Sequence, residues 1–187
     1  RHAAGAPTGE VPRNGPRRRN LMRRKSVLLA TIGLIGALLA WRLLTAVLVP
    51  APTGTPYQRL AFGLAALLPA AAVLAAMILA QMGARFSAVV IDPTAGRDTR
   101  FLVVNQRVIS NTVEQLAVFI PAMLAFAARS LPADIPGLLA LGIVFALGRL
   151  AFWAGYLRAP LFRAPGMAAT AGANLAALVG AIWVWLA

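Results

Sequence analysis

Three polar side chains lie at helical spacing inside an apolar stretch, and their types suit an anionic ligand. In NQRVISNTVEQLAVFIPAMLAFA (105–127), Arg107, Asn111 and Glu114 are spaced i, i+4 and i+7, so they share one face of a helix. A charge at the centre of a membrane costs roughly 2.5–3.5 kcal/mol on insertion scales, so this polar face requires an explanation. Two interpretations are open: an Arg–Glu pair with an amide that holds helices together, or a binding site.

A second string of cationic and hydrogen-bonding residues favours the binding site. In GRLAFWAGYLRAPLFRAPG (148–166), Arg149 and Tyr156 lie along one helical face with an aromatic residue between them, and Arg163 follows after a proline. Glu114 is the one carboxylate expected near these guanidinium groups. Because a guanidinium stays charged and binds carboxylates through two parallel hydrogen bonds, this excess of positive charge predicts an anionic guest.

The elements that must position these residues are membrane-spanning helices. Of the 187 residues, 60% are hydrophobic and 12% are charged, which is typical of a membrane protein. A helix needs roughly 20 apolar residues to cross the hydrocarbon core. The apolar runs of about this length are Val27–Val49, Leu60–Ala84, Val108–Ala128, Gly137–Tyr156 and Met167–Ala187. The sequence therefore predicts an all-α integral membrane helical bundle, in which the first run is a retained anchor rather than a signal peptide, since no small-x-small cleavage site follows it.

The basic residues predict an orientation in the membrane. The formal net charge is +13, and eight of the basic residues precede the first apolar run. Residues 1–26 are expected to form a disordered tail that binds anionic lipid headgroups, and not nucleic acid, since nothing downstream resembles a nucleic-acid-reading module. Later arginines gather in the second and fourth connections, on the same side as this tail. The positive-inside rule then places the N-terminus in the cytoplasm and the C-terminus on the opposite side of the membrane. We expect this membrane to be a bacterial inner membrane, with the C-terminus in the periplasm.

Small and aromatic residues give further expectations about packing. Gly172, Ala176 and Gly180 recur every four residues, which allows another helix to approach closely. Tryptophans at positions 41, 183 and 185 are expected at membrane interfaces. The chain has no cysteine, which excludes disulfides and a protein thiolate as nucleophile, and no metal-ligand cluster is visible.

The two polar strings together resemble the MAPEG family, the membrane-associated proteins of eicosanoid and glutathione metabolism. The resemblance rests on R-x-x-x-N-x-x-E at Arg107 to Glu114 and on the R-L-x-[YF]-x-x-G-Y-x-R-x-x-x-x-R string from Arg149 to Arg163. It implies a four-helix unit over residues 57–187, with residues 27–49 as an added N-terminal transmembrane helix, in a bacterial-type member. It also implies a homotrimer that holds glutathione near its cytoplasmic face.

The resemblance implies roles for the polar residues. Glutathione would be the co-substrate, held by substrate-binding residues at six positions: Arg107, Asn111, Glu114, Arg149, Tyr156 and Arg158. Arg163 and Arg85 would be the catalytic residues that favour the thiolate, because a nearby cation lowers the pKa of a thiol.

Two functions from different classes follow from this resemblance. The first is a membrane glutathione transferase or peroxidase that acts on lipophilic electrophiles or lipid hydroperoxides. The second is a non-catalytic protein, either a lipid-binding relative or an accessory subunit of a membrane complex. Phe152 stands where many glutathione-using relatives have tyrosine, and Gln115 stands where some have an aromatic residue.

Overall fold

The computed structural model describes residues 16–49, 55–87 and 98–187. Its elements in chain order are α1 (Pro16–Val47), α2 (Pro56–Ser87), α3 (Arg100–Arg129), η1 (Pro132–Asp134), α4 (Ile135–Arg158), η2 (Pro160–Arg163) and α5 (Ala164–Leu186), where η denotes a short 3-10 helix. Within the described ranges, five helices are long and apolar enough to cross a membrane. The predicted all-α membrane bundle is therefore confirmed.

Most of the helices extend beyond the apolar runs that predicted them. Helix α3 begins at Arg100, well before Val108, and the Thr99 hydroxyl caps it by accepting a hydrogen bond from the Leu102 N–H at 3.3 Å. Helix α1 begins at Pro16, so the expectation of disorder is wrong for residues 16–26, while residues 1–15 lie outside the described part. Hydropathy marks the segment inside the hydrocarbon, whereas backbone hydrogen bonds can continue the helix into the headgroup region.

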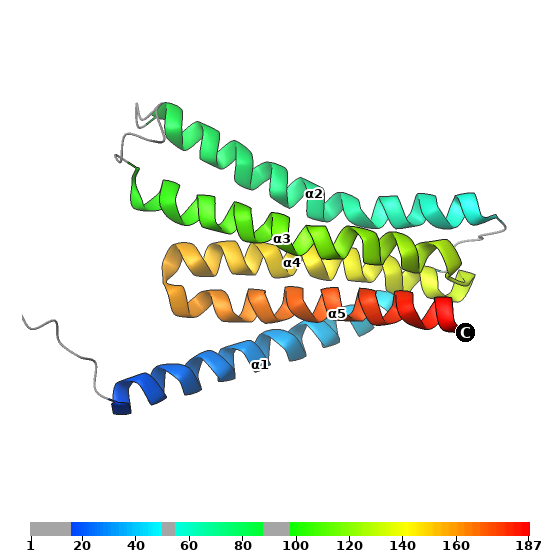
Figure 1. Cartoon of the computed structure of the whole chain (residues 1–187), viewed down its shortest axis with the longest axis horizontal. Coiled ribbons are helices and arrows are strands. Elements are labelled where there is room, and N and C mark those ends of the chain that lie inside the picture. The colour runs from blue at the N-terminus through cyan, green and yellow to red at the C-terminus, as the bar shows by residue number, and fades with distance from the viewer. Residues whose placement is uncertain (1–15, 50–54, 88–97) are drawn as a thin grey trace, which may run out of the picture.

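The helices alternate in direction along the bundle. In Figure 1, α1, α3 and α5 run one way and α2 and α4 run the other. The start of α1 and the end of α5 therefore lie at opposite ends of the molecule. The start of α1, the end of α2, the start of α3 and the end of α4 therefore share one end. These are the segments that carry most of the arginines, and this end is called the basic end below.

The core joins α2, α3 and α4 through aromatic stacking and close backbone contact. The rings of Phe119 in α3 and Phe145 in α4 stack with centroids 4.2 Å apart. At Gly142 of α4, an added Cβ would collide with the carbonyl of Ala66 in α2, so the two backbones touch where only glycine fits. This packing fixes α3 against α4, the two helices that carry the polar strings.

Helix α1 packs on α4 and α5 and supports the turn that precedes α5. Gly33 lies against the backbone of Pro165, and a Cβ added to Gly172 would lie 2.7 Å from the Leu34 side chain. Gly180 lies under the ring of Phe126 from α3. Close helix approach at the small residues of α5 is thus confirmed, whereas the division of the chain into a tail, an added helix and a four-helix unit stays a prediction.

Candidate functional site

A polar pocket lies at the basic end, between α3 on one side and α4, η2 and the start of α5 on the other. Its volume is about 680 Å³. Its lining residues are Asp98, Val103, Gln106, Arg107, Ser110, Asn111, Glu114, Phe152, Tyr156, Arg163 and Met167. The structure therefore brings five of the eight predicted site residues into one pocket: Arg107, Asn111, Glu114, Tyr156 and Arg163.

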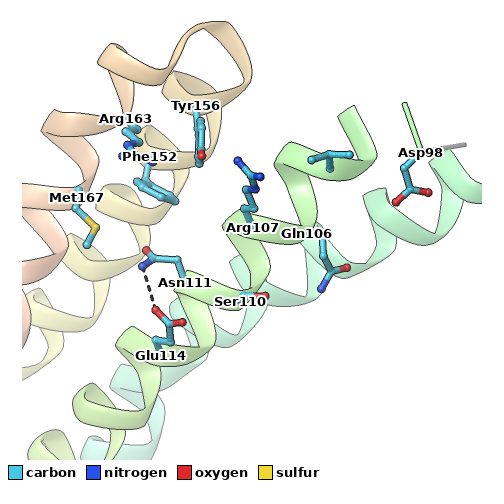
Figure 2. A pocket seen from close by; sticks show the side chains of 11 residues that line it. Asp98, Gln106, Arg107, Ser110, Asn111, Glu114, Phe152, Tyr156, Arg163 and Met167 are labelled. Atoms are coloured by element: carbon cyan, nitrogen blue, oxygen red, sulfur yellow. Dashed lines mark hydrogen bonds between the residues drawn. The ribbon is translucent and has the colours of Figure 1, made fainter. Parts of the chain in front are cut away.

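The α3 wall presents a cation, an amide and a carboxylate in successive turns. Figure 2 shows Arg107, Asn111 and Glu114 along one side of α3. The Asn111 amide donates a hydrogen bond to Glu114 Oε2 at 3.3 Å. Among the described residues, Arg107 forms no ion pair, since a spacing of seven residues puts it two turns from Glu114. The interpretation of these residues as an Arg–Glu pair that serves only packing requires an Arg107–Glu114 ion pair, which the described residues do not form.

The opposite wall is built by aromatic residues and a second cation. Helix α4 ends at Arg158, where Ala159 is extended and Pro160 starts η2. This turn brings Arg163 back over the Tyr156 ring, with its guanidinium carbon 4.9 Å from the ring centroid. Tyr156 packs edge-on against Phe152 at 5.8 Å. Two guanidinium groups from separate elements, Arg107 and Arg163, therefore line the same pocket.

Arg149 was expected to contact substrate, but the structure places it behind the pocket wall. Its side chain is fully buried, with 0% exposure. Nε and Nη2 donate to the Thr112 hydroxyl at 3.1 and 2.8 Å, and Nη1 donates to Asn111 Oδ1 at 3.1 Å. The guanidinium also lies 4.2 Å from the centroid of the Phe152 ring. Arg149 thus contacts one residue from each wall of the pocket, Asn111 of α3 and Phe152 of α4. It does not line the pocket itself, because it lies about two helical turns before Tyr156 and deeper in the bundle.

Two other predicted residues lie outside the lining of the pocket. Arg85 at the end of α2 forms a two-pronged ion pair with Asp98, at 3.1 and 3.3 Å, and Asp98 itself lines the pocket. Arg158 is exposed, with its guanidinium carbon 5.8 Å from the Phe162 ring centroid. The second polar string included Arg158 in the predicted set, but α4 ends at this residue and leaves its side chain exposed.

Sequence reasoning missed several lining residues and one polar cluster. Val103 and Ser110 lie four residues before and three after Arg107, so the same helical periodicity could have identified them. Met167 and Asp98 depend on tertiary packing and carry no such signal. Behind the pocket, the buried Asn105 amide donates to Gln81 Oε1 at 2.9 Å, which ties α3 to α2 through two polar residues inside apolar runs.

Together, the fold and the pocket define an integral membrane helical bundle with a polar pocket at one end, lined by two arginines and two carboxylates. The model of the MAPEG family matches residues 60–183, which is about two thirds of the chain. The chain belongs to the MAPEG family, as its two polar strings predicted. Helix α1 lies outside the matched residues, and a comparison with curated proteins finds no match.

Proposed function

We propose that the protein is a membrane glutathione transferase or peroxidase that binds glutathione in the polar pocket. The observation that carries this proposal is the presence of Arg107 and Arg163, from α3 and η2, in one pocket of about 680 Å³. Glutathione has two carboxylates, one ammonium and one thiol. Membership of the MAPEG family supports glutathione or eicosanoid metabolism in general.

The pocket offers a partner for each charged group of glutathione. Arg107 and Arg163 each suit a carboxylate, because the guanidinium fork matches carboxylate geometry. Glu114 suits the ammonium group. Asn111 adds an amide whose orientation Arg149 and Glu114 fix from both sides. Tyr156 offers a hydroxyl beside Arg163, within reach of either the peptide or its sulfur.

In this proposal the protein stabilises the thiolate of glutathione. A neighbouring guanidinium favours the charged form of a thiol and so lowers its pKa. Arg163 faces the pocket and takes this role with the N–H donors that its carboxylate contact leaves free, whereas Arg85 would first have to leave Asp98. In the transferase reaction the thiolate sulfur forms a bond to an electrophilic carbon. Either a leaving group departs with its bonding electron pair, or the electron pair of the broken bond moves to a neighbouring atom, which takes up a proton. In the peroxidase reaction two glutathione molecules and one lipid hydroperoxide give glutathione disulfide, the lipid alcohol and water.

The surroundings of the pocket favour a lipophilic acceptor and a trimer. Phe152, Val103 and Met167 supply apolar lining, and an acceptor dissolved in the bilayer could reach them laterally. Arg107 and Glu114 are exposed on the surface of the single chain. Because charges facing lipid are costly, we infer that neighbouring subunits cover this face in a homotrimer, and that each pocket is completed at a subunit contact.

We also propose that the basic end lies in the cytoplasm of a bacterial cell, with the membrane around the bundle as the inner membrane. The gathering of the arginine-rich helix ends at one end of the molecule supports this orientation, because positively charged segments remain on the cytoplasmic side. The C-terminus would then be periplasmic. Lipids would contact the outer faces of the five apolar helices.

Glutathione binding can be tested through thermal stability. A ligand that binds only the folded protein stabilises it by RT ln(1 + [L]/Kd), so millimolar glutathione should raise the unfolding temperature of the detergent-solubilised protein. Arg107→Gln should reduce this increase, because it weakens glutathione binding. Arg42→Gln removes an exposed arginine of α1 at the other end of the bundle and should retain it. If the wild-type protein gained no stability, the proposal would be wrong.

A non-catalytic, lipid-binding role is the second candidate, and Phe152 is the observation that favours it. The phenylalanine lines the pocket without the hydroxyl that many glutathione-using relatives have there. A protein of this kind could use the two arginines of the pocket for a lipid carboxylate. Stabilisation by a fatty acid, with none by glutathione, would support this alternative.

A further inference from the structure

A second cavity lies at the other end of the bundle from the polar pocket. It has a volume of about 740 Å³ and is lined by α1, the end of α3, η1, α4 and α5. Its lining residues are Trp41, Phe126, Arg129, Leu131, Asp134, Leu141, Ala176, Val179, Gly180, Trp183, Val184 and Ala187. Most of this lining is apolar or aromatic, with one cation and one anion.

The cavity follows from the small residues of α5. Leu34 of α1 fills the space over Gly172, and Phe126 of α3 lies against Gly180. Between these two contacts, Ala176 is too small to fill the gap and lines the cavity instead. On the α1 side, the Trp41 indole donates a hydrogen bond to the Gly137 carbonyl at 3.0 Å, which fixes it as a wall.

The charged residues of the cavity lie where the helices end. Arg129 is the last residue of α3, and its guanidinium lies over the Trp185 ring at 4.7 Å and donates to the Trp185 carbonyl at 3.3 Å. Asp134, in the turn before α4, accepts a hydrogen bond from the Leu131 N–H at 2.7 Å. The part of the lining that α5 contributes extends from Ala176 to Ala187, which is about 16 Å along a helix. One cation and one anion, which form no ion pair with each other, thus lie beside an apolar surface of α5 in the same cavity.

We propose that this cavity binds one zwitterionic glycerophospholipid whose headgroup carries a phosphate and a primary ammonium. Arg129 would bind the phosphate and Asp134 the ammonium, while an acyl chain would lie along Ala176 and the aromatic walls. Charge complementarity selects this ligand, since an anionic phospholipid would satisfy Arg129 but place only like charge near Asp134. The site is separate from the polar pocket. Helix α1, which lies outside the residues that the family model matches, contributes Trp41 to it.

Lipid retention by the purified protein tests this site. The delipidated protein in detergent is mixed with phosphatidylethanolamine or phosphatidylglycerol of the same acyl chains, and bound lipid is counted by native mass spectrometry. One phosphatidylethanolamine should bind per chain, at least about tenfold more tightly than phosphatidylglycerol. Ala176→Phe should abolish this binding by filling the cavity. Ala171→Phe adds the same bulk at an exposed position of α5 that does not line the cavity, and should leave binding unchanged.

The charged groups provide a test that leaves the apolar lining of the cavity unchanged. Arg129→Gln should weaken phosphatidylethanolamine binding about tenfold, and Asp134→Asn should remove the preference over phosphatidylglycerol. Equal binding of both lipids by the wild-type protein would overturn the proposal. So would lipid binding that survives Ala176→Phe, or a cavity occupied by a second copy of the chain, seen as an oligomer that Ala176→Phe dissociates.

Discussion

Replacement of the buried Arg149 by lysine should weaken glutathione binding although this residue does not line the pocket. The arginine fork contacts Asn111 and Thr112 at the same time, through three hydrogen bonds of 2.8 to 3.1 Å. A lysine keeps the positive charge, but its single ammonium cannot reproduce the fork. We expect it to retain Thr112 and to lose Asn111, whose amide is then free to turn away from Glu114.

The expected size of the effect follows from the lost contact. A hydrogen bond to a charged group contributes about 1.5–3 kcal/mol. If loss of the Arg149–Asn111 bond misplaces the amide, the Kd for glutathione should rise by at least about tenfold, since each 1.4 kcal/mol corresponds to roughly a factor of ten. Isothermal titration of the detergent-solubilised variant with glutathione measures this change, and its unfolding temperature without ligand should also fall.

Thr112→Val is the matched control, because it removes the other acceptor of the same guanidinium. The buried Thr112 hydroxyl also donates to the Val108 carbonyl at 2.7 Å, so this variant should lower stability by about 1–3 kcal/mol. It leaves the Arg149–Asn111 bond in place and should change the Kd less than threefold. Unchanged affinity in Arg149→Lys, or equal losses in both variants, would refute the positioning role of Arg149.

Two further predictions concern packing and orientation. Gly142→Leu should abolish folding or lower stability by more than about 3 kcal/mol, because an added Cβ collides with the Ala66 carbonyl, whereas Gly36→Ala, with nothing within 4 Å, should be neutral; equal thermal unfolding of both variants would contradict the contact. In the cysteine-free chain, a membrane-impermeant maleimide added to spheroplasts should label Leu131→Cys and spare Ser87→Cys, and the reverse pattern would contradict the proposed orientation.

The sequence predicted the helices and one face of the pocket because both depend on local periodicity. The five apolar runs match the five long helices in the part of the chain that the structure describes. The spacing of Arg107, Asn111 and Glu114 predicted their position on one wall of the pocket. Helix ends were predicted less well, as at Pro16, because hydropathy reports the hydrocarbon and not the last hydrogen-bonded turn.

The second wall of the pocket depended on tertiary geometry that spacing does not contain. Arg149 and Tyr156 share a helical face, which predicts the same exposure for both. In the folded bundle, however, Arg149 is fully buried behind Asn111, because α3 packs against this part of α4. The position of Arg85 at the end of α2 is compatible with a role at the thiolate, but its pairing with Asp98, which follows the connection after α2, is a tertiary contact. Such pairings between distant segments need a structure, because either residue alone is compatible with several partners.

Glutathione affinity in the two arginine variants is the most direct measurement of the central proposal. The wild-type protein, Arg107→Gln, Arg163→Gln and the double variant can be titrated with glutathione under the same conditions. If both guanidinium groups bind the peptide carboxylates, each single variant should raise the Kd at least about tenfold, and the double variant should show no measurable binding. A wild-type Kd that neither substitution changes would contradict the proposal that α3 and η2 together form an anion site.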